Sequence, residues 1–66
     1  MEKKYEPMLR LKIKRVEKGL TQKELADMVG IGQGVISSYE TGKYFPRKKV
    51  LDRLAQALGC EVRDIL

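Results

Sequence analysis

The chain has 66 residues with a single cysteine, so we expect one domain with a small core, and an internal disulfide is excluded. It has no histidine, which excludes a zinc site with an ordinary ligand set, and we expect neither a metal nor a cofactor. Fourteen Lys and Arg residues against nine Asp and Glu give a formal charge of +5, which favours polyanions as partners.

The first seven residues, MEKKYEP, include three consecutive charged residues. We expect residues 1–7 to form a flexible N-terminal arm and residues 8–66 to form the domain. The N-terminus lacks the apolar stretch of a signal peptide, and no apolar run in the chain exceeds two residues. No segment is therefore expected to cross a membrane, and the protein is expected in the cytoplasm.

Residues 8–18 are predicted to form the first helix. Two stripes run along it at helical spacing, one containing Met8, Leu11 and Arg15 and the other containing Leu9, Ile13 and Val16. Because apolar side chains cover more than one face, one stripe is expected to be partly exposed.

The stretch from 21 to 42, TQKELADMVGIGQGVISSYETG, predicts two short helices joined by a tight turn. Thr21 and Glu24 have the spacing of a capping box, which begins the first of these helices. Gly30 is placed to end it in the left-handed conformation. The side chains expected on its buried side are Leu25, Ala26, Met28 and Val29.

The second of the two helices is predicted over residues 33–41, after Gly32 as a weak N-cap and before Gly42 as its end. Val35, Ile36 and Tyr39 are expected on one side, with Gln33, Gly34, Ser37 and Ser38 facing outward. Beyond a loop at 43–46, Pro46 suits the first turn of a helix over residues 47–58. Its expected buried side comprises Val50, Leu51, Leu54, Ala55 and Leu58.

From residue 11 to residue 66 this order of features resembles the lambda repressor-like family, the Cro and phage-repressor type of helix-turn-helix also called the XRE family. The resemblance rests on the joint spacing of Arg15, the Gly19-Leu20-Thr21-Gln22 entry, the Glu24-Leu25-Ala26 core, Gly30, Ile36, the Glu40-x-Gly42 exit and Ala57-Leu58-Gly59. It implies an all-α, compact five-helix domain whose helices 2 and 3 form the helix-turn-helix. Residues 60–66 match the short fifth helix, although Glu61 stands where Ser or Thr is usual.

The resemblance also implies an ion pair between Arg15 and Glu40. A guanidinium fits a carboxylate through two parallel hydrogen bonds. A buried pair of this kind would fix the orientation of the helix at 33–41 against the first helix. The alternative is two solvated charges.

Readout of the DNA major groove needs side chains at the exposed N-terminal end of the helix at 33–41. The expected base contacts are Gln33, Gly34, Val35, Ser37 and Ser38. Gln33 is the strongest candidate, because an amide that both donates and accepts matches N6 and N7 of adenine. Gly34 departs from the polar residue frequent in the family and favours close backbone approach, a thymine-methyl contact from Val35, or weaker specificity. The alternative for the polar residues is ordinary solvent exposure.

The expected phosphate contacts are Thr21, Gln22, Lys43, Tyr44 and Arg47. In similar repressors the glutamine at position 22 holds a phosphate and braces the base-contacting glutamine. The free amides at a helix N-terminus also attract anions. Basic residues gather at 10–18 and 43–49, whereas 24–41 contains no lysine or arginine. Basic segments beside an uncharged helix suit contacts to phosphates and bases, respectively.

These features predict a sequence-specific regulator of transcription that binds double-stranded DNA as a homodimer, most simply a repressor at an inverted-repeat operator. With no nucleophile beside a base, no enzymatic activity is expected. The alternative is a protein-interaction module on the same fold, either an antitoxin bound to a toxin or an adaptor bound to a polymerase-associated regulator. A third hypothesis is that the 66 residues are the DNA-binding piece of a longer regulator.

Overall fold

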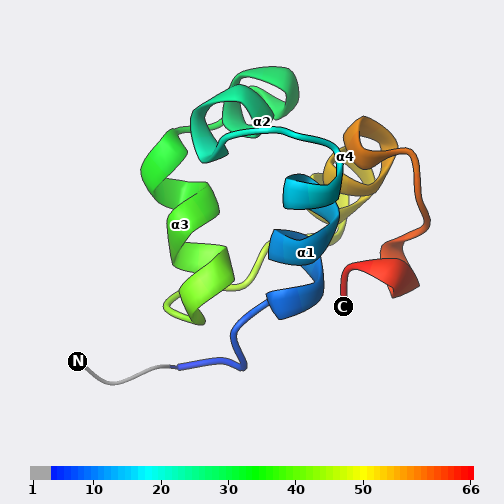
Figure 1. Ribbon diagram of the computed structural model, residues 1–66. Helices are drawn as coiled ribbons and strands as arrows, with labels where there is room; N and C mark the ends of the chain where they lie inside the picture. Colours follow the sequence, from blue (N-terminus) through cyan, green and yellow to red (C-terminus); the bar gives the residue numbers. More distant parts are fainter. Residues whose placement is uncertain (1–3) are drawn as a thin grey trace.

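The computed structural model describes residues 4–66, which contain four α-helices, one short 3-10 helix and no strand. The elements are α1 (Leu9–Glu17), α2 (Gln22–Val29), α3 (Gln33–Thr41), α4 (Lys48–Leu58) and η1 (Val62–Asp64). Figure 1 shows α2 and α3 meeting at a tight turn, with α1 and α4 beside them. The predicted all-α domain is therefore confirmed.

Local signals set the ends of α2 and α3. The Thr21 hydroxyl accepts a hydrogen bond from the Glu24 amide at 3.0 Å, and the Glu24 carboxylate accepts one from the Thr21 amide at 2.8 Å. This is the predicted capping box. Gly30 and Gly42 end the two helices with φ of +81° and +87°, values that favour glycine because a Cβ is strained there. The predicted bounds of α3 agree with the structure.

The other helix bounds differ slightly from those predicted. Met8 and Arg47 have non-helical backbone angles and cap α1 and α4, so each helix begins one residue later than expected. Pro46 consequently precedes the cap of α4 rather than lying in its first turn. The predicted fifth helix is a single 3-10 turn. A hydrogen bond of 2.9 Å from the Glu61 amide to Asp64 closes that turn, and Ile65 enters the core directly after it.

The core is built from every helix and from the residue that follows η1. Its largest fully buried side chains are Leu11, Leu25, Ile36, Leu54, Leu58 and Ile65. Two predicted core positions are wrong, since Met28 is 56% exposed and Val35 is also exposed. Both lie about a quarter turn away from the buried stripe of their short helices, which have 100° between successive residues. Val50 is only half buried.

The two stripes of α1 have different environments. Met8, Leu11 and Arg15 are buried, whereas Leu9, Ile13 and Val16 are 61%, 53% and 57% exposed. The expectation that one stripe is exposed is confirmed.

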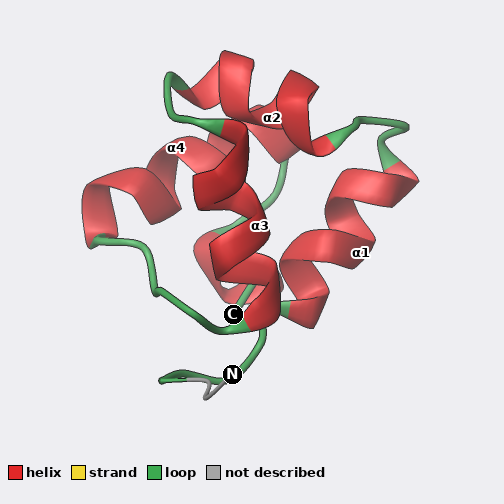
Figure 2. Ribbon diagram, turned by 90° about the vertical axis from the view of Figure 1, so that its left-hand side faces the viewer, coloured by secondary structure: helices red, strands yellow, loops and turns green. Residues whose placement is uncertain are grey.

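The N-terminal segment is packed from Tyr5 onward. The Tyr5 amide donates to the Gly42 carbonyl at 2.9 Å, and the Tyr5 ring lies 6.0 Å from that of Phe45. Figure 2 shows this segment crossing beneath the C-terminal end of α3. The expectation of a flexible arm therefore does not describe Tyr5–Pro7, which contact the domain, and its first three residues lie outside the described part of the chain.

Candidate nucleic-acid interface

The N-terminal end of α3 presents the residues expected to contact bases. Gln33, Gly34 and Val35 are exposed, while Ser37 and Ser38 are half buried. A Cβ added at Gly34 would meet no atom within 4 Å, so the backbone is open to close approach there. The Ser38 hydroxyl donates to the Gly34 carbonyl at 2.9 Å. Ser38 therefore has lone pairs but no free proton to offer a base.

A buried ion pair fixes α3 against α1. Arg15 Nε donates to Glu40 Oε2 at 2.7 Å and Arg15 Nη2 donates to Glu40 Oε1 at 3.2 Å. The two residues are only 8% and 6% exposed. Arg15 Nη1 also donates to the Leu20 carbonyl at 2.8 Å, which satisfies a further proton of the buried guanidinium.

The same carboxylate holds Gln22, a contact that sequence reasoning missed. Gln22 Nε2 donates to Glu40 Oε1 at 3.0 Å, whereas the resemblance implied that Gln22 braces Gln33. Its side-chain oxygen remains available as an acceptor. No local pattern links positions 22 and 40, which come together only when α2 packs on α3, so the sequence carried no signal for this bond.

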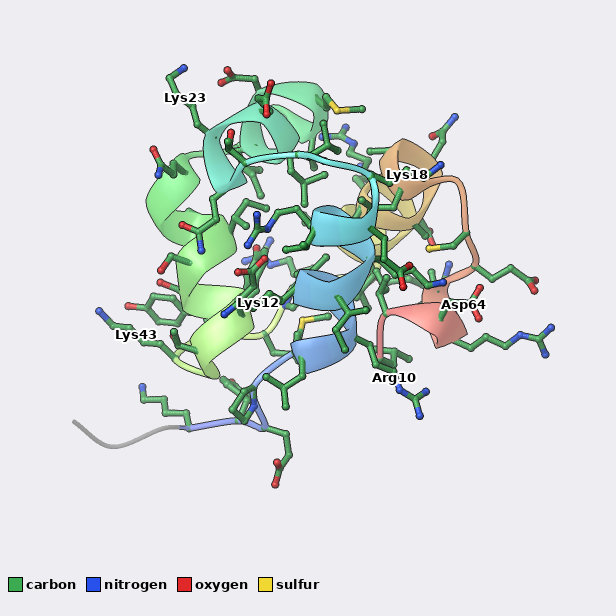
Figure 3. The ribbon with its side chains drawn as sticks, viewed as in Figure 1. Arg10, Lys12, Lys18, Lys23, Lys43 and Asp64 are labelled. Atoms are coloured by element: carbon green, nitrogen blue, oxygen red, sulfur yellow. The ribbon has the colours of Figure 1, made fainter. Side chains whose placement is uncertain are left out.

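The loop between α3 and α4 carries the remaining expected phosphate contacts. The amides of Lys43 and Tyr44 both donate to the Ser38 carbonyl, at 2.9 and 3.2 Å, which holds the start of the loop on α3. The Lys43 ammonium lies 5.5 Å from the centre of the Tyr44 ring. Figure 3 shows Lys43 pointing outward beside the C-terminal end of α3. Lys43, Tyr44 and Arg47 are all exposed.

Ion pairing separates available cations from neutralised ones. Lys23, Lys48 and Arg63 pair with Asp27, Asp52 and Glu61 at 2.9 to 3.2 Å. Within residues 4–66, Lys43 and Arg47 form no ion pair. Arg47 instead lies near Tyr39, whose pKa is raised by burial and only partly lowered by the arginine charge. Two uncompensated cations thus flank the uncharged α3.

A model of the helix-turn-helix family matches residues 11–65. The chain therefore belongs to the helix-turn-helix family, and the predicted lambda repressor-like type is confirmed by its structural neighbours. The P22 c2 repressor, solved in complex with a synthetic operator, has a TM-score of 0.85 at 29% identity over 92% of this chain and 94% of that one. The restriction-modification controller protein C.AhdI from Aeromonas hydrophila has a TM-score of 0.83 at 31% identity, covering 88% of each chain.

Relatives fall into two groups by name. Multiprotein-bridging factor 1 of Candida albicans is 47% identical over 49 residues, which are 74% of this chain and 32% of that protein. An uncharacterized HTH-type transcriptional regulator of Methanothermobacter thermautotrophicus is 46% identical over 52 residues, which are 77% of this chain and 75% of that protein. The chain thus spans only 32% of the bridging factor. In residues 4–66, no helix has the length and apolar character needed to cross a membrane.

Proposed function

We propose that this domain binds double-stranded DNA with the N-terminal end of α3 in the major groove and regulates transcription, most simply as a repressor. One observation carries the proposal: Gln33 is exposed at the start of a helix without lysine or arginine, and the unpaired cations Lys43 and Arg47 follow that helix. The amide of Gln33 suits adenine, and the cations suit phosphates. The P22 c2 repressor supports it, since its domain of the same fold was solved on an operator.

We further propose that two copies bind one site. A two-fold pair of recognition helices spaced by roughly one DNA turn, ~34 Å, requires an inverted repeat. Each copy would contribute Gln33, Gly34, Val35, Ser37 and Ser38 to bases and Thr21, Gln22, Lys43, Tyr44 and Arg47 to phosphates.

Selection of bound duplexes from a random pool at about physiological salt tests both proposals. The wild type should enrich an inverted repeat, and Gln33→Ala should relax one adenine position in each half-site by roughly 1–3 kcal/mol of discrimination. Gln56→Ala, which alters an exposed glutamine on α4, is the matched control and should select the same site as the wild type. Enrichment of a single unrepeated half-site would contradict the dimer, and no enrichment at all would contradict sequence-specific binding.

A protein-interaction module is the second candidate function. It is favoured by the relatives named as bridging factors and by the exposed apolar stripe on α1. Such a module would bind DNA without sequence preference while holding a protein partner at stoichiometric concentration. Failure of the duplex selection would therefore move this candidate ahead of the repressor.

A further inference from the structure

The outer face of α1 carries an apolar stripe that nothing in residues 4–66 covers. Leu9, Ile13 and Val16 are each more than half exposed and lie at i, i+4 and i+7, so their side chains form one ridge about 10 Å long. Their exposed area is on the order of 300 Å², the size of patch that often has a function on a monomeric protein. Exposure of three apolar side chains at this spacing indicates a contact surface for another molecule.

Cations border the ridge on both sides. In Figure 3, Lys12 points from α1 toward α3, and Arg10 points to the other side of α1, toward the C-terminal residues. Within residues 4–66 neither side chain forms an ion pair. The one carboxylate on this face, Glu17, lies 3.8 Å from Lys14 and is already compensated. A molecule that covers the ridge therefore meets uncompensated positive charge at both edges.

The ridge lies on a different side of the molecule from the exposed surface of α3. Met8, Leu11 and Arg15 fill the inward side of α1, so the ridge points away from the core. Figure 2 looks onto α3, with α1 at the edge of the view, whereas Figure 1 looks onto α1 with α3 at its side. A molecule on the ridge would leave the N-terminal end of α3 open.

We propose that the outer face of α1 binds an acidic amphipathic helix of a partner protein. Apolar side chains of that helix would cover the ridge, and its carboxylates would pair with Lys12 and Arg10. A second copy of this chain is a poorer occupant, because it would place each unpaired lysine and arginine near another set of cations. The ridge is also small beside the ~800 Å² that each partner contributes to a standard protein interface. A single short helix matches its length.

Selection from a phage-displayed library of random 16-residue peptides tests the proposal, because it samples many candidate helices at once. The wild type should enrich peptides with glutamate and aspartate flanking apolar residues at helical spacing. An enriched peptide, synthesised and labelled, should bind Ile13→Asp about tenfold or more weakly than the wild type. Met28→Asp introduces the same charge at an equally exposed apolar position on α2 and should bind the peptide like the wild type.

Charge reversal tests the second half of the proposal. Lys12→Glu combined with Arg10→Glu should weaken the acidic peptide and leave the helical content of the protein unchanged, since both residues are exposed. No enrichment, enrichment of basic peptides, or equal losses in Ile13→Asp and Met28→Asp would overturn it.

Two further measurements address other occupants. Self-association in sedimentation velocity that Ile13→Asp abolishes would assign the ridge to a second copy. Co-sedimentation with phosphatidylcholine–phosphatidylserine vesicles that the same variant abolishes would assign it to a lipid surface. Either result would overturn the acidic-helix proposal. The inference does not depend on DNA binding, which the duplex selection tests independently.

Discussion

Glu40 is the residue at which three helices are joined. It lies on α3 and accepts hydrogen bonds from Arg15 of α1 and Gln22 of α2. We expect Glu40→Ala to cost roughly 3–5 kcal/mol, because it leaves a buried guanidinium with only the Leu20 carbonyl as a partner. A core of this size supplies about the same net stability, so the variant should be largely unfolded. Urea unfolding followed by circular dichroism measures the loss.

Two further variants separate the loss of a partner from the loss of packing. Glu40→Gln retains an acceptor for Arg15 and should be less destabilised than Glu40→Ala. The double variant Arg15→Met with Glu40→Leu removes both buried charges and should recover much of the stability. A loss for Glu40→Ala within ~0.5 kcal/mol of the wild type, as for an ordinary surface substitution, would contradict a structural role for the pair.

Gly42 connects two elements that are distant in sequence, the end of α3 and the N-terminal segment. A Cβ at this position would collide with the Tyr5 carbonyl oxygen and approach the Pro7 nitrogen to 3.0 Å. Gly42→Ala should therefore destabilise the domain in two ways, through positive φ and through displacement of the segment. Urea unfolding measures the first effect together with the second, and hydrogen exchange of the Tyr5 amide reports the segment alone.

Gly30→Ala is the matched control for this prediction. Gly30 has a similar φ of +81°, but a Cβ there would meet no atom within 4 Å. Its substitution should cost about 1–2 kcal/mol for the left-handed conformation alone. Equal losses for the two alanine variants, with unchanged exchange of the Tyr5 amide, would show that the N-terminal segment contributes nothing.

The elements that the sequence predicted well are those set by local chemistry. The capping box at Thr21 and the glycines after α2 and α3 fix helix ends through residues three or fewer positions apart, so their positions were visible in the sequence. The misplaced features depend on tertiary contacts. Met28 is excluded from the core by the direction in which α2 packs, and Tyr5 is ordered by a residue 37 positions away. The site follows the same division, since α3 was predicted but the bond from Gln22 to Glu40 was not.

On the scale of the whole molecule, the formal charge of +5 is distributed over regions with different functions. Pairs such as Lys23 with Asp27 and Arg63 with Glu61 cancel locally. The uncompensated cations that matter for the two proposals lie in two places, after α3 and along α1. Because these places lie on different sides of the domain, DNA and an acidic helix could be bound together.

The salt dependence of DNA binding tests where the phosphate contacts lie. A cation that neutralises one phosphate adds about 0.9 to the slope of log K against log salt. Lys43→Ala should lower the slope by about this amount and leave the preferred sequence unchanged, because a phosphate contact carries no base information. Arg63→Ala removes an equally exposed cation that is already paired with Glu61 and should leave the slope intact. A Lys43→Ala variant with altered base preference and an unchanged slope would place Lys43 at a base edge instead, and the orientation proposed for α3 on the duplex would have to be revised.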